Sequence, residues 1–361
     1  MSFLKNLFSK KEVPVESYED FWNWFQNNGK TFFKVVRDEN NIKENFLDEL
    51  SDKLSNIKEG FYFLTGMLDD TTAELILTAD GDLKNIIFIE EIISKAPSVK
   101  NWKFTAHKPA IDIVNVAIKM DGYNFSSENL SFYSNDDPDY PDEIEITVVH
   151  DDYTDENSDI INRGIFIFLD NYLGEINYAT SVDTTSVISK GEAQKDLIPI
   201  EKLKSYLVWR EKEFIEKYEN VVPDVEEAFL VYEGKINDGS YYIGTMNSNL
   251  LAWEYKASHP WFAVIKLEFD SENGLPDDAV ADKLNYFEDN LLELLTSQKG
   301  NLYLGRETNN GKREIYFACR DFRNASKVLY QSQENHLLTE DFTYEIYKDK
   351  YWLTLKHYMS L

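Results

Sequence analysis

The sequence predicts an α+β protein of at least two domains, and three observations lead to this fold class. Hydrophobic residues make up 43% and aromatic residues 14% of the chain, which is more apolar material than a disordered protein carries. The length of 361 residues exceeds what one ordinary core needs. Apolar residues recur at helical steps in some segments and alternate as in strands in others. We expect the domain boundary at residues 221–224, between an N-terminal domain over 1–220 and a C-terminal domain over 221–361.

The N-terminal domain is predicted to begin with two helices, over residues 17–28 and 41–57. We expect Gly29 to end the first helix, because glycine readily adopts the left-handed conformation found after many helices. A strand, a strand, a helix and a strand are then predicted over residues 61–65, 75–79, 83–94 and 102–106.

The same order of strand, strand, helix and strand recurs later, over residues 130–134, 143–149, 158–172 and 176–179. The repetition favours an N-terminal domain built from two ββαβ units related by duplication, an interpretation that depends on element order alone. A helix over residues 200–218 then leads to the domain boundary.

The C-terminal domain is predicted to open with a hairpin over residues 229–234 and 241–246, which turns at Asp238 and Gly239. The elements expected next are a strand over 261–269, a helix capped by Asp277, strands over 302–306 and 313–319 joined at Asn309-Asn310-Gly311, a helix over 324–333 and a strand over 342–346. This order is typical of the ferredoxin-like split βαβ plan, an antiparallel sheet with two helices on one face.

The C-terminal domain also carries a resemblance to a known family. The matching features are Trp253-Glu254-Tyr255, the strand from Trp261 to Phe269, Gly274-Leu275-Pro276, Phe287-Glu288-Asp289-Asn290-Leu291 and Tyr303-Leu304-Gly305-Arg306-Glu307-Thr308. Through them, residues 225–361 resemble the bacterial domain-of-unknown-function family 695. In fold, that family is similar to the type B regulator of ribonuclease E activity, a small acidic protein that inhibits a nuclease by binding it. The resemblance therefore implies a binding module, although fold similarity alone does not carry function.

The chain is strongly acidic, with 37 Lys and Arg against 65 Asp and Glu and a net charge of −28. This charge disfavours nucleic acid and anionic membranes as partners and favours a basic protein. We expect a cytoplasmic protein, because no apolar run is long enough to span a membrane and no signal peptide opens the chain. The basic, amphipathic residues 1–11 leave two alternatives, contact with a membrane surface or a loose terminus.

Known catalytic and metal-binding motifs are missing from the sequence. The single Cys319 excludes an internal disulfide, and we expect it to be a small buried hydrophobe. The five histidines form no zinc-binding pair, and no glycine-rich phosphate loop occurs. His150 is the best metal candidate because Asp151 and Asp152 follow it, with a plain surface residue as the alternative. We therefore assign no catalytic, cofactor-binding or metal-binding residue.

Two features are candidates for contact with a partner protein. Residues 136–159 hold eleven acidic residues and no Lys or Arg. We take seven of their aspartates as candidates: Asp136, Asp137, Asp139, Asp142, Asp151, Asp152 and Asp155. The alternatives are a calcium site, for which the EF-hand glycine and final glutamate are missing, and a merely solvated surface. The second feature is the aromatic group Trp253, Tyr255 and Trp261, which would anchor a partner if it is exposed. The alternative is that these residues cover the sheet as part of the core.

The leading hypothesis is a non-enzymatic, protein-binding module of a regulatory or immunity type. The rival hypothesis is a hydrolase or small-molecule binder with its site between the two domains. A structural scaffold is the third. The sequence leaves these three hypotheses and the oligomeric state open.

Overall fold

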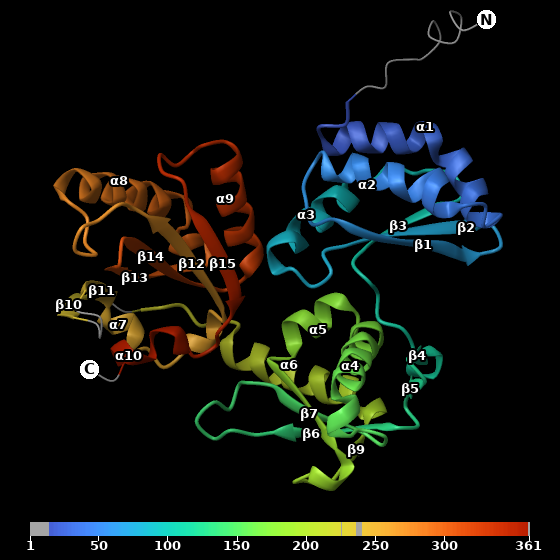
Figure 1. Ribbon diagram of the computed structural model, residues 1–361. Coiled ribbons are helices and arrows are strands. Elements are labelled where there is room, and N and C mark those ends of the chain that lie inside the picture. The colour runs from blue at the N-terminus through green and yellow to red at the C-terminus, as the bar shows by residue number, and fades with distance from the viewer. Residues whose placement is uncertain (1–13, 225, 236–239, 360–361) are drawn as a thin grey trace, which may run out of the picture. The chain divides into compact units, whose positions relative to one another are not determined.

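The computed structural model describes residues 14–224, 226–235 and 240–359 and confirms an α+β protein with several sheets (Figure 1). The chain divides into two compact units. Of the described residues, unit 1 contains those up to Ala110 together with Gly174–Ile176, and unit 2 contains Ile111–Leu173 and those from Asn177 on. The domain boundary expected at residues 221–224 stays a prediction. Residues 1–11 and the turn expected at Asp238 and Gly239 lie outside the described residues.

Unit 1 packs helices against one face of a sheet. Its elements are α1 (Tyr18–Arg37), a π-helical stretch (Lys43–Leu47), α2 (Asp48–Ser55), β1 (Tyr62–Asp69), β2 (Thr72–Thr78), α3 (Leu83–Ser94) and β3 (Trp102–Ala106). The sheet order is β1-β2-β3, with an antiparallel hairpin of β1 and β2 and a parallel pairing of β2 and β3. Aromatic rings join α1 to β3, since Phe25 lies 5.0 Å from Trp102 and 5.1 Å from Phe104 between ring centroids.

The prediction that Gly29 ends the first helix was wrong, because α1 continues to Arg37. Gly29 is buried, and the indole Nε1 of Trp102 donates a 2.8 Å hydrogen bond to its carbonyl oxygen. A Cβ at this position would lie only 2.9 Å from Cγ1 of Val99. The glycine therefore allows close approach between α1 and the segment around β3, and does not mark the end of the helix.

The part of unit 2 before residue 219 packs helices against a sheet of its own. Its elements are β4 (Ile118–Met120), β5 (Tyr123–Phe125), β6 (Leu130–Asn135), β7 (Glu145–His150), α4 (Ser158–Leu173), α5 (Glu175–Ser181, whose first two residues belong to unit 1), β8 (Thr184–Ser189), β9 (Ile198–Pro199) and α6 (Leu203–Tyr218). The sheet order is β8-β7-β6-β9. Its core includes Phe132, Ile146 and Phe168, which are fully buried.

The two predicted ββαβ units share one topology. In both, an antiparallel hairpin is followed by a helix and by a strand that lies parallel to the second hairpin strand, as in β1-β2-β3 and β6-β7-β8. Both also carry an ion pair between a lysine after the last strand and an aspartate after the central strand. The Nζ to Oδ1 distance is 2.6 Å for Lys108 and Asp80 and 3.0 Å for Lys190 and Asp151. The two units therefore share a topology, and their origin by duplication stays a prediction.

The last strand of the second unit was predicted at the wrong place. Residues 176–179 belong to helix α5, and the strand is β8, at Thr184–Ser189. Gly174, with φ of +81°, ends α4 and lets the chain turn directly into α5. The backbone hydrogen bonds of β8 depend on β7, which lies far away in sequence, so the local pattern misplaced the strand.

The C-terminal part of unit 2 contains one antiparallel sheet. Its elements are β10 (Phe229–Lys235), β11 (Tyr241–Asn247), α7 (Ser248–Leu251), β12 (Trp261–Glu268), α8 (Asp278–Leu294), β13 (Asn301–Asn309), β14 (Lys312–Cys319), α9 (Phe322–Glu334), β15 (Thr343–Lys348) and α10 (Lys356–Met359). The sheet order is β10-β11-β13-β14-β12-β15. The predicted order of elements from Trp261 onward is confirmed, and the ferredoxin-like assignment itself stays a prediction.

The C-terminal sheet is covered on both faces. Helices α8 and α9 lie on one side of it (Figure 1), where Trp261 packs on Phe322 at 4.6 Å between ring centroids. On the other face, Phe262 and Val264 join a core cluster with Trp352. Both faces of β12 are therefore buried. The predicted cap is confirmed, because Asp277 accepts a 2.8 Å hydrogen bond from the backbone N–H of Val280.

Candidate functional site

Strand β7 divides the acidic segment into two groups. Asp136, Asp137, Asp139 and Asp142 precede it, and Asp151, Asp152 and Asp155 follow it. A strand of 6 residues spans about 20 Å. The seven aspartates therefore lie at opposite ends of β7 and do not form one continuous acidic surface.

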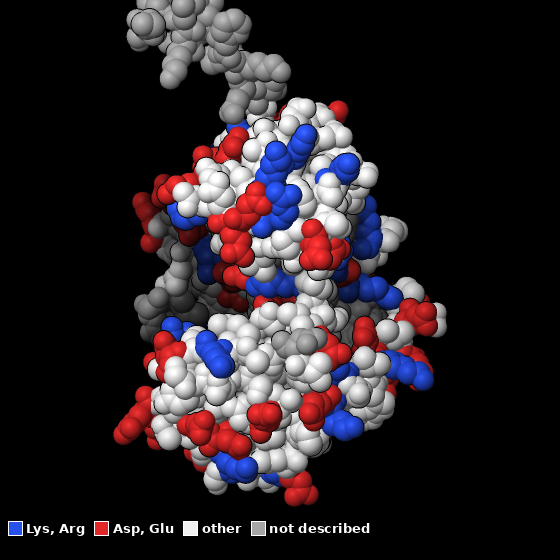
Figure 2. Space-filling view, turned by 90° about the vertical axis from the view of Figure 1, so that its right-hand side faces the viewer, with Lys and Arg blue, Asp and Glu red and all other residues white. Residues whose placement is uncertain are grey.

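The exposed aspartates are partly neutralised by neighbouring cations. Asp136 lies 3.8 Å from Nζ of Lys195 and 3.9 Å from the guanidinium of Arg210, and Asp151 pairs with Lys190. Asp137, Asp139, Asp152 and Asp155 are also exposed. Basic and acidic side chains are interspersed over the face shown in Figure 2, so charge alone does not single out one binding patch there.

Asp142 differs from the other aspartates because it is held in a network of hydrogen bonds. Its carboxylate accepts hydrogen bonds from the Tyr218 hydroxyl at 2.6 Å, and from Lys217 Nζ and the Tyr351 hydroxyl at 2.9 Å. Burial acts to raise the pKa of Asp142, but these donors outweigh it and hold the pKa below its ordinary value. The carboxylate is only 12% exposed and has little surface for a partner.

Asp183 extends this network within unit 2. Its two carboxylate oxygens lie 2.8 Å from Nζ of Lys348 and 2.7 Å from Nζ of Lys350, and Lys350 also donates to the backbone carbonyl of Asp142. Burial lowers the pKa of Lys348 to about 8, and the neighbouring Lys350 acts in the same direction. The rival hypothesis expects a site between the two predicted domains, which is where these groups lie. Their charges are paired with one another in this structure.

The aromatic candidates are mostly core residues. Trp253 is 9% and Trp261 is 6% exposed, whereas Tyr255 is 43% exposed. The two indoles also pack on different groups. The ring centroid of Trp253 lies 6.2 Å from that of Trp352, and Trp261 packs on Phe322. The aromatic surface expected before β12 is therefore reduced to Tyr255.

His150 and Cys319 are both buried. The surface position considered for His150 was wrong, because its ring is fully buried and Nδ1 accepts a 3.0 Å hydrogen bond from the backbone N–H of Asp152. Burial raises the pKa of the Cys319 thiol to about 12, which keeps it protonated and unreactive. Among the described residues, no group of three or more His, Cys, Asp or Glu is arranged to hold a metal ion.

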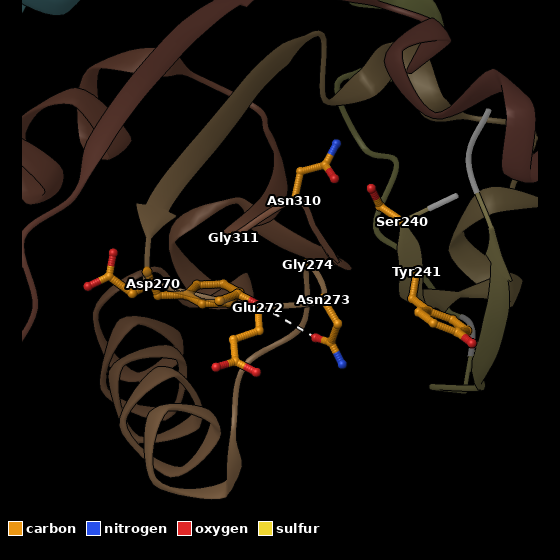
Figure 3. A pocket seen from close by; sticks show the side chains of 10 residues that line it. Ser240, Tyr241, Asp270, Glu272, Asn273, Gly274, Asn310 and Gly311 are labelled. Carbon is orange, nitrogen blue, oxygen red and sulfur yellow. Dashed lines mark hydrogen bonds between the residues drawn. The ribbon is translucent and has the colours of Figure 1, made fainter. Parts of the chain in front are cut away.

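The loops at one end of the C-terminal sheet surround a polar hollow of about 620 Å³ (Figure 3). It is lined by Ser240, Tyr241, Phe269, Asp270, Ser271, Glu272, Asn273, Gly274, Asn310 and Gly311. The carboxylates of Asp270 and Glu272 point in different directions and do not converge on one point. The hollow therefore offers scattered hydrogen-bonding groups and no paired carboxylates for acid-base chemistry.

Sequence reasoning missed a further candidate, the edge strand β10. Three consecutive apolar residues of this strand are exposed, namely Phe229 (39%), Leu230 (50%) and Val231 (62%). β10 pairs with β11 on one side and ends the sheet order on the other. The signal was present in the sequence as an apolar run, but such a run is normally assigned to the core.

Among the described residues, no helix combines the length and the apolar character needed to cross a membrane.

The comparisons with known proteins give one match, to a family model. No curated protein and no solved structure is similar enough to the chain to count as a match. Residues 227–360 match the model of a family of unknown function, DUF695, which confirms the resemblance of the C-terminal region to this family.

Proposed function

We propose that this protein is a non-enzymatic, acidic module that binds an extended, basic segment of a partner protein along strand β10. The observation that carries this proposal is the exposed apolar run Phe229, Leu230 and Val231 on the edge of a sheet. An edge strand presents backbone N–H and C=O groups that can pair with an added strand.

β10 has little of the protection that edge strands usually carry. Natural edges are commonly guarded by lysine, proline or a bulge. The strand contains no proline, its lysine is the last residue, Lys235, and its register with β11 is continuous from Phe229 to Lys235. A partner segment can therefore align over the full described strand.

Charge favours a basic partner over a second copy of the chain. The exposed Glu226, Glu227 and Glu233 lie in or next to β10. Two copies that each carry a net charge of −28 repel each other, whereas a Lys- or Arg-rich segment is attracted. The predicted fold similarity to the type B regulator of ribonuclease E activity, which acts by binding, agrees with a regulatory or immunity-type role. We propose that this protein acts in the cytoplasm.

The test uses two synthetic peptides of ten residues, one alternating Lys with Val and one alternating Glu with Val, and measures their binding by fluorescence anisotropy. We expect the Lys peptide to bind the wild-type chain and V231K to bind it at least ~10-fold more weakly, because the new ammonium group repels the peptide on the strand itself. The matched control is V208K on α6. Val208 is 64% exposed, so a lysine there adds the same charge at a surface position outside β10. Equal weakening in V208K and V231K, or equally tight binding of the Glu peptide, contradicts the proposal.

A further inference from the structure

Glu175 is a buried carboxylate inside unit 1, although it follows α4 in the chain. It is 2% exposed. One carboxylate oxygen accepts a hydrogen bond from the Gly81 N–H at 3.1 Å. The other accepts from the Thr78 hydroxyl at 2.5 Å and the Lys108 N–H at 3.1 Å. Burial acts to raise the pKa of Glu175, but these donors and the His107 ring outweigh it and lower the pKa to about 2.

The donors around Glu175 come from the carboxyl ends of the parallel strands β2 and β3. Thr78 is the last residue of β2, and His107 and Lys108 follow β3. Asp80, Gly81 and His107 all have positive φ, at +50°, +83° and +63°. The carboxyl ends of parallel strands are where open α/β sheets bind ligands, and strained backbone of this kind gathers at functional sites. We refer to Thr78, Gly81, His107 and Lys108 as the carboxylate cradle.

His107 supplies an independent indication of a ligand. Its side chain is buried, with the residue 4% exposed, and among the described residues neither ring nitrogen has a hydrogen-bond partner. Nδ1 points at the carboxylate of Glu175 but stops 3.6 Å from Oε1, and Nε2 lies 3.9 Å from Oε1 of Glu90. Buried ring nitrogens that make no hydrogen bond are costly, and a carboxylate placed slightly closer than Glu175 would satisfy Nδ1.

We propose that the carboxylate cradle is a binding site for a carboxylate ligand and that Glu175 is its built-in occupant, which an external carboxylate replaces when residues 174–176 withdraw. The donors match a planar group with two acceptor oxygens, one for Gly81 and one shared by Thr78 and Lys108. A doubly charged phosphate is disfavoured, because Glu90 and Asp80 lie beside the cradle and the Lys108 ammonium is paired with Asp80 at 2.6 Å. The proposal is independent of β10.

The experiment empties the cradle in the full-length chain and offers it sodium acetate. E175A removes the occupant, and the thermal unfolding midpoint is followed by circular dichroism in acetate, in acetamide and in sodium chloride at equal concentration. Acetamide has the shape of acetate without its charge. We expect acetate to raise the midpoint of E175A by about 3 °C more than either control, because a ligand that binds only the folded state stabilises it.

Two further variants make the outcome specific. The wild-type chain, in which the tethered Glu175 competes with acetate for the cradle, should respond to acetate less than E175A does. E175A/T78V, which lacks the Thr78 hydroxyl, should not respond beyond the chloride control. If E175A does not fold in chloride, the refolding yield in acetate replaces the midpoint, and recovery in acetate but not in acetamide supports the site. Equal behaviour of E175A in acetate, acetamide and chloride overturns the proposal.

Discussion

At Gly164 a single methyl group decides whether α4 can pack. Gly164 is buried in the middle of α4, and a Cβ at this position would overlap the ring of Phe125, which is itself fully buried. We expect Gly164→Ala to lower the free energy of unfolding by about 1–3 kcal/mol, because neither helix α4 nor the Phe125 ring can move without disturbing the core. Urea unfolding followed by circular dichroism measures the loss.

Gly66 is the matched control for this substitution. It lies in β1, and no atom comes within 4 Å of a Cβ built there. Gly66→Ala should be neutral or slightly stabilising, since it restricts only the unfolded chain. A loss in G66A as large as that in G164A would show that the overlap with Phe125 is not the cause.

At the scale of elements, Glu288 holds α8 on the C-terminal sheet. Its carboxylate is 5% exposed and accepts hydrogen bonds from the Tyr303 hydroxyl and from Arg306 at 2.8 Å, with Arg313 3.5 Å away. We expect Glu288→Ala to lower the free energy of unfolding by about 3 kcal/mol, because it leaves the buried guanidinium of Arg313 and the half-buried guanidinium of Arg306 without their carboxylate. Chemical denaturation measures this change.

Glu293→Ala is the control on the same helix. Glu293 is exposed, so its removal should change the stability by no more than ~0.5 kcal/mol. Similar losses in both variants would mean that the helix propensity of α8, and not the buried carboxylate, determines the result.

Elements with strong local signals were predicted well. The helix over 83–94, the turn at Asn310 and Gly311 and the cap at Asp277 are confirmed, because each depends on residues within one or two turns of the chain. The end of α1 and the position of β8 were predicted wrongly, because the first depends on Trp102 and Val99 and the second on β7. Those partners are distant in sequence.

At the scale of the whole molecule, Asp183 links the two parts of unit 2. It pairs with Lys348 and Lys350 of the C-terminal part and accepts a 2.7 Å hydrogen bond from the backbone N–H of Ile144. We expect Asp183→Asn to lower the stability by about 3 kcal/mol, because two largely buried ammonium groups lose their carboxylate. Differential scanning calorimetry should then show the two parts unfolding in separate steps.

Asp136→Asn is the control for Asp183→Asn, because the Asp136 side chain is 71% exposed and its ion pairs are long. It should leave the calorimetric profile unchanged, as exposed ion pairs contribute little. An unchanged profile in D183N as well would show that the link between the two parts does not depend on Asp183.

The candidate site was less predictable than the elements. The sequence pointed to acidic and aromatic residues, yet Asp142 is held in a network with Tyr218 and Tyr351, and Trp253 and Trp261 are buried. The carboxylate cradle joins β2, β3 and Glu175, which no local pattern connects. Its members carry no motif, so only their position in space reveals them.

The sequence by itself determined the fold class, most of the helices and strands and the net charge, because these properties depend on local periodicity and composition. Its short motifs also carried the resemblance of the C-terminal region to a family of unknown function. The tertiary structure alone decided which charges are paired, which apolar residues remain exposed on β10, and where a buried carboxylate meets its donors. Burial and electrostatics depend on neighbours that the fold brings together from distant parts of the chain, and these neighbours leave no local pattern in the sequence.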